Sequence, residues 1–121
     1  MDSDESKPVA DAALVYEVLQ GDTEQFGKLV ARYKNLVMSF IAARVAADEV
    51  EDLAQETFMR AFRVLPSLRD PAAFSSWLLG IANHVCVDWH RSRRRVASLD
   101  AEHAAEPDAK LVGLHLSLIH I

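Results

Sequence analysis

The sequence has a single cysteine, Cys86, among its 121 residues, which excludes an internal disulfide. It also lacks histidine or cysteine pairs at metal-ligand spacing, a glycine-rich phosphate loop and a nucleophile motif. We therefore expect no metal, no cofactor and no enzymatic function, and we interpret Cys86 as a small core residue. The best remaining catalytic pair is His84 with Asp88, four residues apart, but no third group accompanies it.

No apolar run approaches the roughly 20 residues needed to cross a membrane. The N-terminal stretch MDSDESKPVADAA is acidic and lacks the basic and apolar blocks of a secretory signal. We therefore expect a cytoplasmic protein.

The net charge is also small, but the charged residues are unevenly distributed along the chain. The formal net charge is −5, while residues 57–95 carry seven arginines against Asp70 and Asp88. The acidic total argues against a general nucleic-acid coat. The basic segment still allows a local surface that contacts phosphate.

Strand-like alternation is absent, and apolar residues instead recur at helical spacing in four segments. The expected helices span about 11–20, 22–41, 48–65 and 70–95. Their predicted boundary signals are glycine or proline stops and acidic caps: Gly21, Pro66, Asp22 with Gln25, Asp48 with Glu51, and Asp70 before Pro71. The predicted fold class is all-α, a compact bundle of about four helices.

Three regions are expected along the chain. Residues 1–9 are predicted to be disordered and 10–95 to form the helical domain. Residues 96–121 are predicted to be an acidic linker and an apolar tail, LVGLHLSLIHI. That tail either docks on the core or is non-native sequence at a truncated end.

The third predicted helix has an unusual outer face. A plain solvated helix more often alternates Glu and Lys, whereas this face combines acids, an amide, a thioether and a cation. It is therefore either solvated or a docking surface for a partner helix bearing arginines. Its residues are Asp52, Gln55, Glu56, Met59 and Arg63.

The fourth predicted helix ends in HRSRRR. Cations there complement the helix macrodipole, but four arginines exceed that need, and guanidinium groups suit phosphate. Upstream lie Ser75, Ser76, Asn83 and His84, a face that is either solvated or able to contact unpaired bases. Trp77 and Trp89 fall on the apolar stripe, so core packing is favoured over base stacking, although Trp89, next to the arginines, could also be half exposed.

Two segments follow each other along the chain: GDTEQFGKLVARYKNLV, then VEDLAQETFMRAFRVLPSLRDPAAFSSWLLGIANHVCVDWHRSRRR. In sequence and in order they resemble region 2 of bacterial sigma factors of the extracytoplasmic-function group. The resemblance covers about residues 11–95. It implies a transcription initiation factor domain that docks on the clamp helices of the largest subunit of core RNA polymerase. It also implies recognition of the single-stranded minus-ten promoter element, and an anti-sigma factor as partner.

The resemblance assigns two sets of residues. The outer face of the third helix would bind polymerase: Asp52, Gln55, Glu56, Met59 and Arg63. The loop before the fourth helix, the exposed side of that helix and one arginine of the third would bind DNA: Arg60, Leu68, Arg69, Ser75, Ser76, Asn83, His84, Arg91, Arg94 and Arg95.

The sequence departs from the family pattern in two places. His84 stands where the family usually has Asn, and Asn83 where it has a basic residue, which leaves the base preference open. The helix-turn-helix domain that would follow the linker has no counterpart before the tail. The alternative function is a helical protein-interaction module without DNA activity.

Overall fold

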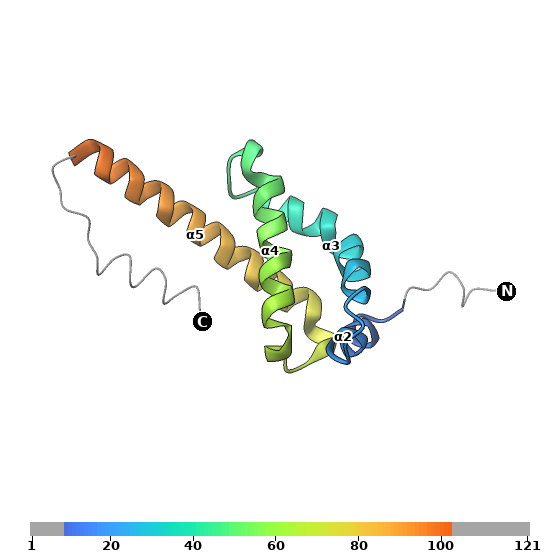
Figure 1. Ribbon diagram of the computed structural model, residues 1–121. Helices are drawn as coiled ribbons and strands as arrows, with labels where there is room; N and C mark the ends of the chain where they lie inside the picture. Colours follow the sequence, from blue (N-terminus) through green and yellow to red (C-terminus); the bar gives the residue numbers. More distant parts are fainter. Residues whose placement is uncertain (1–8, 103–121) are drawn as a thin grey trace.

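The computed structural model describes residues 9–102, and side-chain surroundings for residues 9–99 (Figure 1). In this part the chain forms four α-helices: α2 (Asp11–Leu19), α3 (Gln25–Ala42), α4 (Val50–Val64) and α5 (Phe74–Glu102). Three 3-10 turns join them: η1 (Ala47–Glu49), η2 (Leu65–Ser67) and η3 (Pro71–Ala73). The prediction of an all-α bundle of about four helices is confirmed.

Helix α3 packs against each of the other three helices, α2, α4 and α5, and α4 packs against α3 and α5 (Figure 1). The apolar stripes predicted from the sequence meet in one core, and burial of this surface is the main stabilising contribution to the fold. Its fully buried members include Leu29, Val37, Ile41, Ala61, Phe74, Leu78 and Ala82.

The apolar faces of the predicted helices are wider than the areas that the neighbouring helices cover. Leu19 and Leu36 remain 44% and 45% exposed, because they lie at the edges of their stripes and a small bundle leaves part of each helix uncovered. Trp77 packs against the core with its ring centroid 5.8 Å from that of Phe74, as predicted. Cys86 is buried in the same core.

The helix ends follow some of the predicted signals. Gly21 adopts a φ of +114° after α2, a conformation that favours glycine. The Asp70 carboxylate accepts a hydrogen bond from the Ala72 N–H at 3.1 Å, with Pro71 following it, as predicted. The two predicted capping boxes are wrong: neither α3 nor α4 has a side-chain cap, because each begins through 3-10-type backbone bonds.

Replacement of Asp70 by alanine should lower the free energy of unfolding by about 1 kcal/mol, because the cap bond to Ala72 is lost. Asp22→Ala is the matched control, since within residues 9–102 the Asp22 carboxylate bonds only to the side-chain amide of Gln25. Urea denaturation of both variants measures the difference. Equal stability of the two would contradict a capping role for Asp70.

Helix α5 extends beyond the arginines, to Glu102, where the sequence predicted a linker from residue 96. The segment VASLDAE contains good helix formers and neither glycine nor proline, so nothing local stops the helix. The predicted domain boundaries stay a prediction. Of the segment 1–9 that was predicted to be disordered, residues 1–8 lie outside the described residues, and so does the predicted apolar tail 111–121.

Within residues 9–102, no helix has the length and apolar character required to cross a membrane.

Candidate nucleic-acid and protein interfaces

The outer face of α4 carries the predicted polymerase-binding residues on its solvent side. Asp52, Gln55 and Arg63 are exposed, and Met59 is 53% exposed. Glu56 is partly exposed, because its side chain leans towards Arg60. The structure therefore brings all five residues onto one accessible surface. Whether that surface binds a protein stays a prediction.

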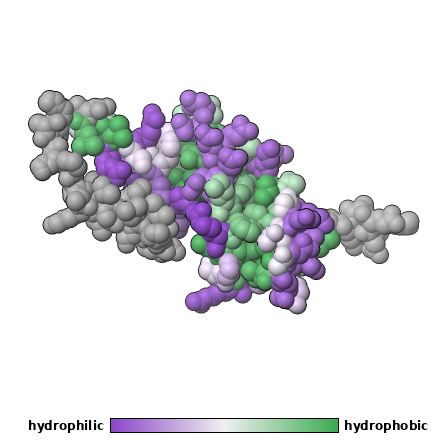
Figure 2. Space-filling view, in the orientation of Figure 1, coloured by the Kyte–Doolittle hydropathy of each residue, from purple (hydrophilic) through white to green (hydrophobic). Residues whose placement is uncertain are grey.

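An apolar groove of about 570 Å³ adjoins this face, between α3 and α4. Figure 2 shows hydrophobic surface gathered over this part of the body with hydrophilic residues around it. Sequence reasoning missed the groove. The available signal was the apolar pair Met59 and Phe62, three residues apart and outside the predicted buried stripe. The lining comprises Phe26, Val30, Lys34, Met38, Glu51, Ala54, Gln55, Phe58, Met59, Phe62 and Arg63.

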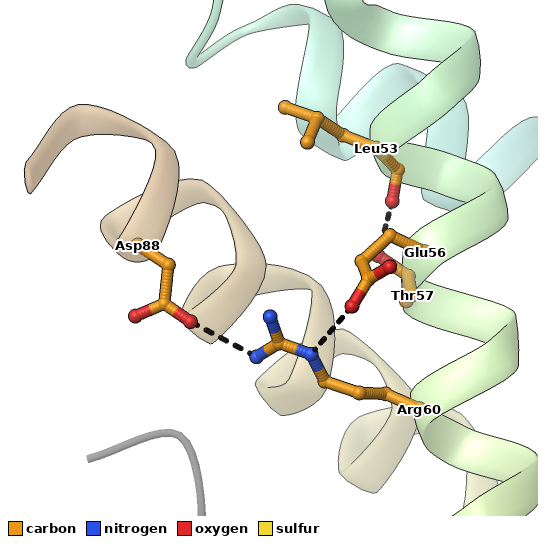
Figure 3. Close-up of polar contacts among 5 residues, drawn as sticks. All are labelled: Leu53, Glu56, Thr57, Arg60 and Asp88. Atoms are coloured by element: carbon orange, nitrogen blue, oxygen red, sulfur yellow. Dashed lines mark hydrogen bonds and ion pairs between the residues drawn. The ribbon is translucent and has the colours of Figure 1, made fainter. Parts of the chain in front are cut away.

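Arg60 lies between α4 and α5 (Figure 3). Its Nε donates to the Glu56 carboxylate at 3.2 Å, and its Nη1 donates to the Asp88 carboxylate at 3.0 Å. The Arg60 and Asp88 side chains are only 15% and 14% exposed. Arg60 was predicted to bind DNA, but two carboxylates of this chain already bind its guanidinium group.

The exposed side of α5 carries most of the predicted DNA-binding residues. Ser76, Asn83 and His84 are exposed. Asn83 lies seven residues after Ser76 and eleven before Arg94, so these three share one face of the helix. Arg94 is exposed, while Arg91 and Arg95 are half-buried. The structure therefore places polar side chains and guanidinium groups along one continuous surface of α5.

Ser75 differs from the others, because it faces towards α3 and is half-buried. Burial raises the pKa of the Tyr33 hydroxyl, and so does its hydrogen bond to the Asp11 carboxylate, while the nearby Ser75 hydroxyl opposes the rise. The Asp11 carboxylate also accepts from Arg32 at 2.6 Å. This cluster ties α2 to α3 near the start of α5.

The loop before α5 is short and well anchored. Leu68 packs against the core, and its N–H donates to the Leu65 carbonyl at 2.9 Å. Arg69 is exposed beside it, and Asp70 caps the following turn. The loop thereby presents Arg69 next to the first turn of α5.

The arginine cluster does not lie at the end of its helix. Helix α5 has no basic residue in its last turn, so complementing the macrodipole does not account for the arginines. Arg93 stacks over the Trp89 ring at 5.0 Å, which occupies a ring face that could otherwise stack on a base. His90 Nε2 lies 2.7 Å from the Arg44 carbonyl and ties α5 to the connection after α3.

The pair predicted to be best suited to chemistry is not assembled as a catalytic pair. Asp88 bonds to Arg60, and His84 faces solvent. In the part of the chain that the structure describes, no group of three or more His, Cys, Asp or Glu side chains could hold a metal ion.

Comparison with known proteins identifies the domain. The family model Sigma-70 region 2 matches residues 29–96. A relative from Haemophilus influenzae named ECF RNA polymerase sigma-E factor is 32% identical over 92% of this chain and 59% of its own length. The protein of that name from Escherichia coli K12 is 40% identical over 64% of this chain and 40% of its own length. The chain thus spans less than two thirds of the length of each of these relatives.

A solved structure agrees with the sequence matches. It is an engineered region 2 of sigmaE in complex with GTAAAA, determined by NMR, with a TM-score of 0.68 and 35% identity. The match covers 72% of this chain and 92% of that one. The resemblance predicted from the sequence is confirmed: the chain belongs to the Sigma-70 region 2 family.

Proposed function

We propose that this domain docks on core RNA polymerase and binds the melted non-template strand of the minus-ten promoter element. One observation carries the proposal: exposed Ser76, Asn83 and His84 share the accessible side of α5 with Arg91, Arg94 and Arg95. The similar solved structure, whose DNA ligand is GTAAAA, supports it.

In this proposal the outer face of α4 binds the clamp helices of the largest polymerase subunit. The support is the accessibility of Asp52, Gln55 and Met59 together on a face that also carries Arg63 and part of Glu56. An acid-and-amide surface beside an adaptable thioether suits a partner helix that bears arginines.

The DNA side uses α5 and the loop before it. Arg69 and the Leu68 loop enclose a base that has left the stack, while the arginines of α5 contact phosphates. Flipping a base costs a few kcal/mol, and contacts worth about 1–3 kcal/mol per stacked base offset that cost. The protein then supplies only binding free energy and performs no covalent step.

Ser75 contributes through structure in this proposal. Its place near Tyr33 supports the junction between α3 and the first turn of α5. Ser76, the neighbouring hydroxyl, is the exposed one and can reach DNA. His84 and Asn83 lie about 100° apart around the helix, so they contact different bases or different edges of one base.

Binding of a labelled single-stranded hexamer tests the DNA side directly. We expect GTAAAA to bind at least about fivefold more tightly than its complement TTTTAC, because one fitted base is worth about 1–3 kcal/mol. Fluorescence anisotropy measures both affinities at one salt concentration. GTAAAA is the ligand of the similar structure, and this domain could prefer other bases. A set of hexamers in which each base is varied in turn is therefore titrated as well. Equal affinity for every hexamer would contradict recognition of a sequence.

The interaction module without DNA activity is the less favoured alternative, because it leaves the arginines of α5 without a role. An anti-sigma factor is a further proposed partner, which the family resemblance alone supports.

A further inference from the structure

We propose that Arg60 is a positioning residue, which pairs with Asp88 at the edge of the proposed DNA-binding face of α5 and does not itself bind the strand. The proposal rests on the proposed function of that face. It goes beyond it by assigning Arg60 a role through Asp88, and by explaining why an aspartate is tolerated at that place.

Asp88 places a negative charge on α5 close to the proposed phosphate contacts. Asp88 lies four residues after His84, three before Arg91 and seven before Arg95. Residues at these spacings form one stripe along a helix. A carboxylate therefore lies between His84 and Arg91 at the α4 edge of the surface proposed to face phosphates, where an uncompensated negative charge repels the ligand.

The ion pair places the positively charged Arg60 guanidinium next to this carboxylate. Arg60 Nη1 and Asp88 Oδ2 are 3.0 Å apart, and both side chains are about six-sevenths buried. Burial reduces screening by solvent and salt, so the pair is stronger than one on the open surface. Among the described residues, Arg60 is the only cation within ion-pair distance of Asp88.

Glu56 fixes the guanidinium from the other side. Nε donates to Glu56 at 3.2 Å while Nη1 donates to Asp88, so one planar group connects two carboxylates on two helices (Figure 3). This arrangement uses the rigid fork of arginine, which a lysine ammonium does not reproduce. A guanidinium so held has little freedom to follow a DNA backbone.

A four-protein comparison tests the assignment: wild type, Arg60→Gln, Asp88→Asn and the double variant. Arg60→Gln should bind the GTAAAA hexamer about fivefold more weakly, since one unpaired charge near a phosphate costs on the order of 1 kcal/mol. Asp88→Asn should bind as well as wild type or better. The double variant should return to within twofold of Asp88→Asn.

The same four proteins give a readout that needs no DNA. Arg60→Gln leaves a largely buried carboxylate unpaired, so its Tm at pH 7 should fall by about 5–10 °C. The double variant should recover most of that loss. Arg60→Lys is expected to recover less, because it keeps the charge but not the fork.

The outcomes separate the two proposals. If wild type fails to bind any hexamer while Asp88→Asn still restores the Tm of Arg60→Gln, the proposed function is wrong and the pairing role stands. If Arg60→Gln and the double variant lose DNA affinity equally, Arg60 contacts the strand directly and the inference is overturned. Should Arg60→Gln not fold, Asp88→Asn alone decides: a loss of more than twofold in affinity overturns the inference.

Discussion

Replacement of Arg91, Arg94 and Arg95 by alanine is expected to weaken binding of the GTAAAA hexamer by about hundredfold at 0.1 M salt. Each phosphate contact to a single strand contributes roughly 0.7 to the slope of log affinity against log salt, so three contacts contribute about 2. The salt dependence of the variant should therefore be flatter by that amount. Anisotropy titrations at several salt concentrations, from about 0.05 to about 0.3 M, measure the affinity and its salt dependence.

The matched control for this variant is Lys28→Ala, Lys34→Ala and Arg63→Ala combined. It removes the same number of positive charges from exposed positions on α3 and α4, away from α5. Its affinity should change little, because these charges lie off the proposed path of the strand. If the control loses as much affinity as the α5 variant, the effect is one of net charge and the proposed phosphate contacts are wrong.

Asp52→Arg is expected to reduce capture of core RNA polymerase by roughly hundredfold, because charge reversal against a cationic partner costs several kcal/mol. Asp52 suits this test better than Glu56. Asp52 is exposed and, among the described residues, forms no ion pair, whereas a change at Glu56 also removes a partner of Arg60. A pull-down with immobilised domain and purified core enzyme measures capture.

Glu17→Arg is the control for this second variant. It makes the same change of charge at an exposed position of α2, away from α4. It should capture polymerase as wild type does, and thermal unfolding should show that both variants fold. Undiminished capture by Asp52→Arg would mean that the polymerase-binding surface lies elsewhere on the domain.

Local patterns in the sequence were sufficient for the helices and the core. Apolar residues spaced three and four apart fall on one side of a helix, and Leu29, Val37 and Phe74, which follow this spacing within the predicted helices, are fully buried. The Asp70 cap was also predictable, because its bond to Ala72 spans two residues. The capping boxes at Asp22 and Asp48 failed because 3-10 turns at the helix starts use backbone acceptors instead.

Candidate surfaces were predictable as faces of single helices. The outer residues of α4 and the arginines of α5 each follow from helical spacing alone, and the structure leaves both faces accessible. The groove between α3 and α4 did not follow, because its lining comes from two helices whose relative placement no local pattern encodes. Ser75 and Ser76 were equivalent in the sequence, and the fold leaves Ser76 exposed while it half-buries Ser75 near Tyr33.

The sequence by itself determined that this chain is a helical bundle of the Sigma-70 region 2 type, because helical periodicity and motif order are local properties. Only the tertiary structure decided what Arg60 contacts. Its partner Asp88 lies 28 residues further along the chain, on another helix. An ion pair at that separation exists only once α4 and α5 have packed, since nothing short of the assembled core brings the two charges within 3.0 Å.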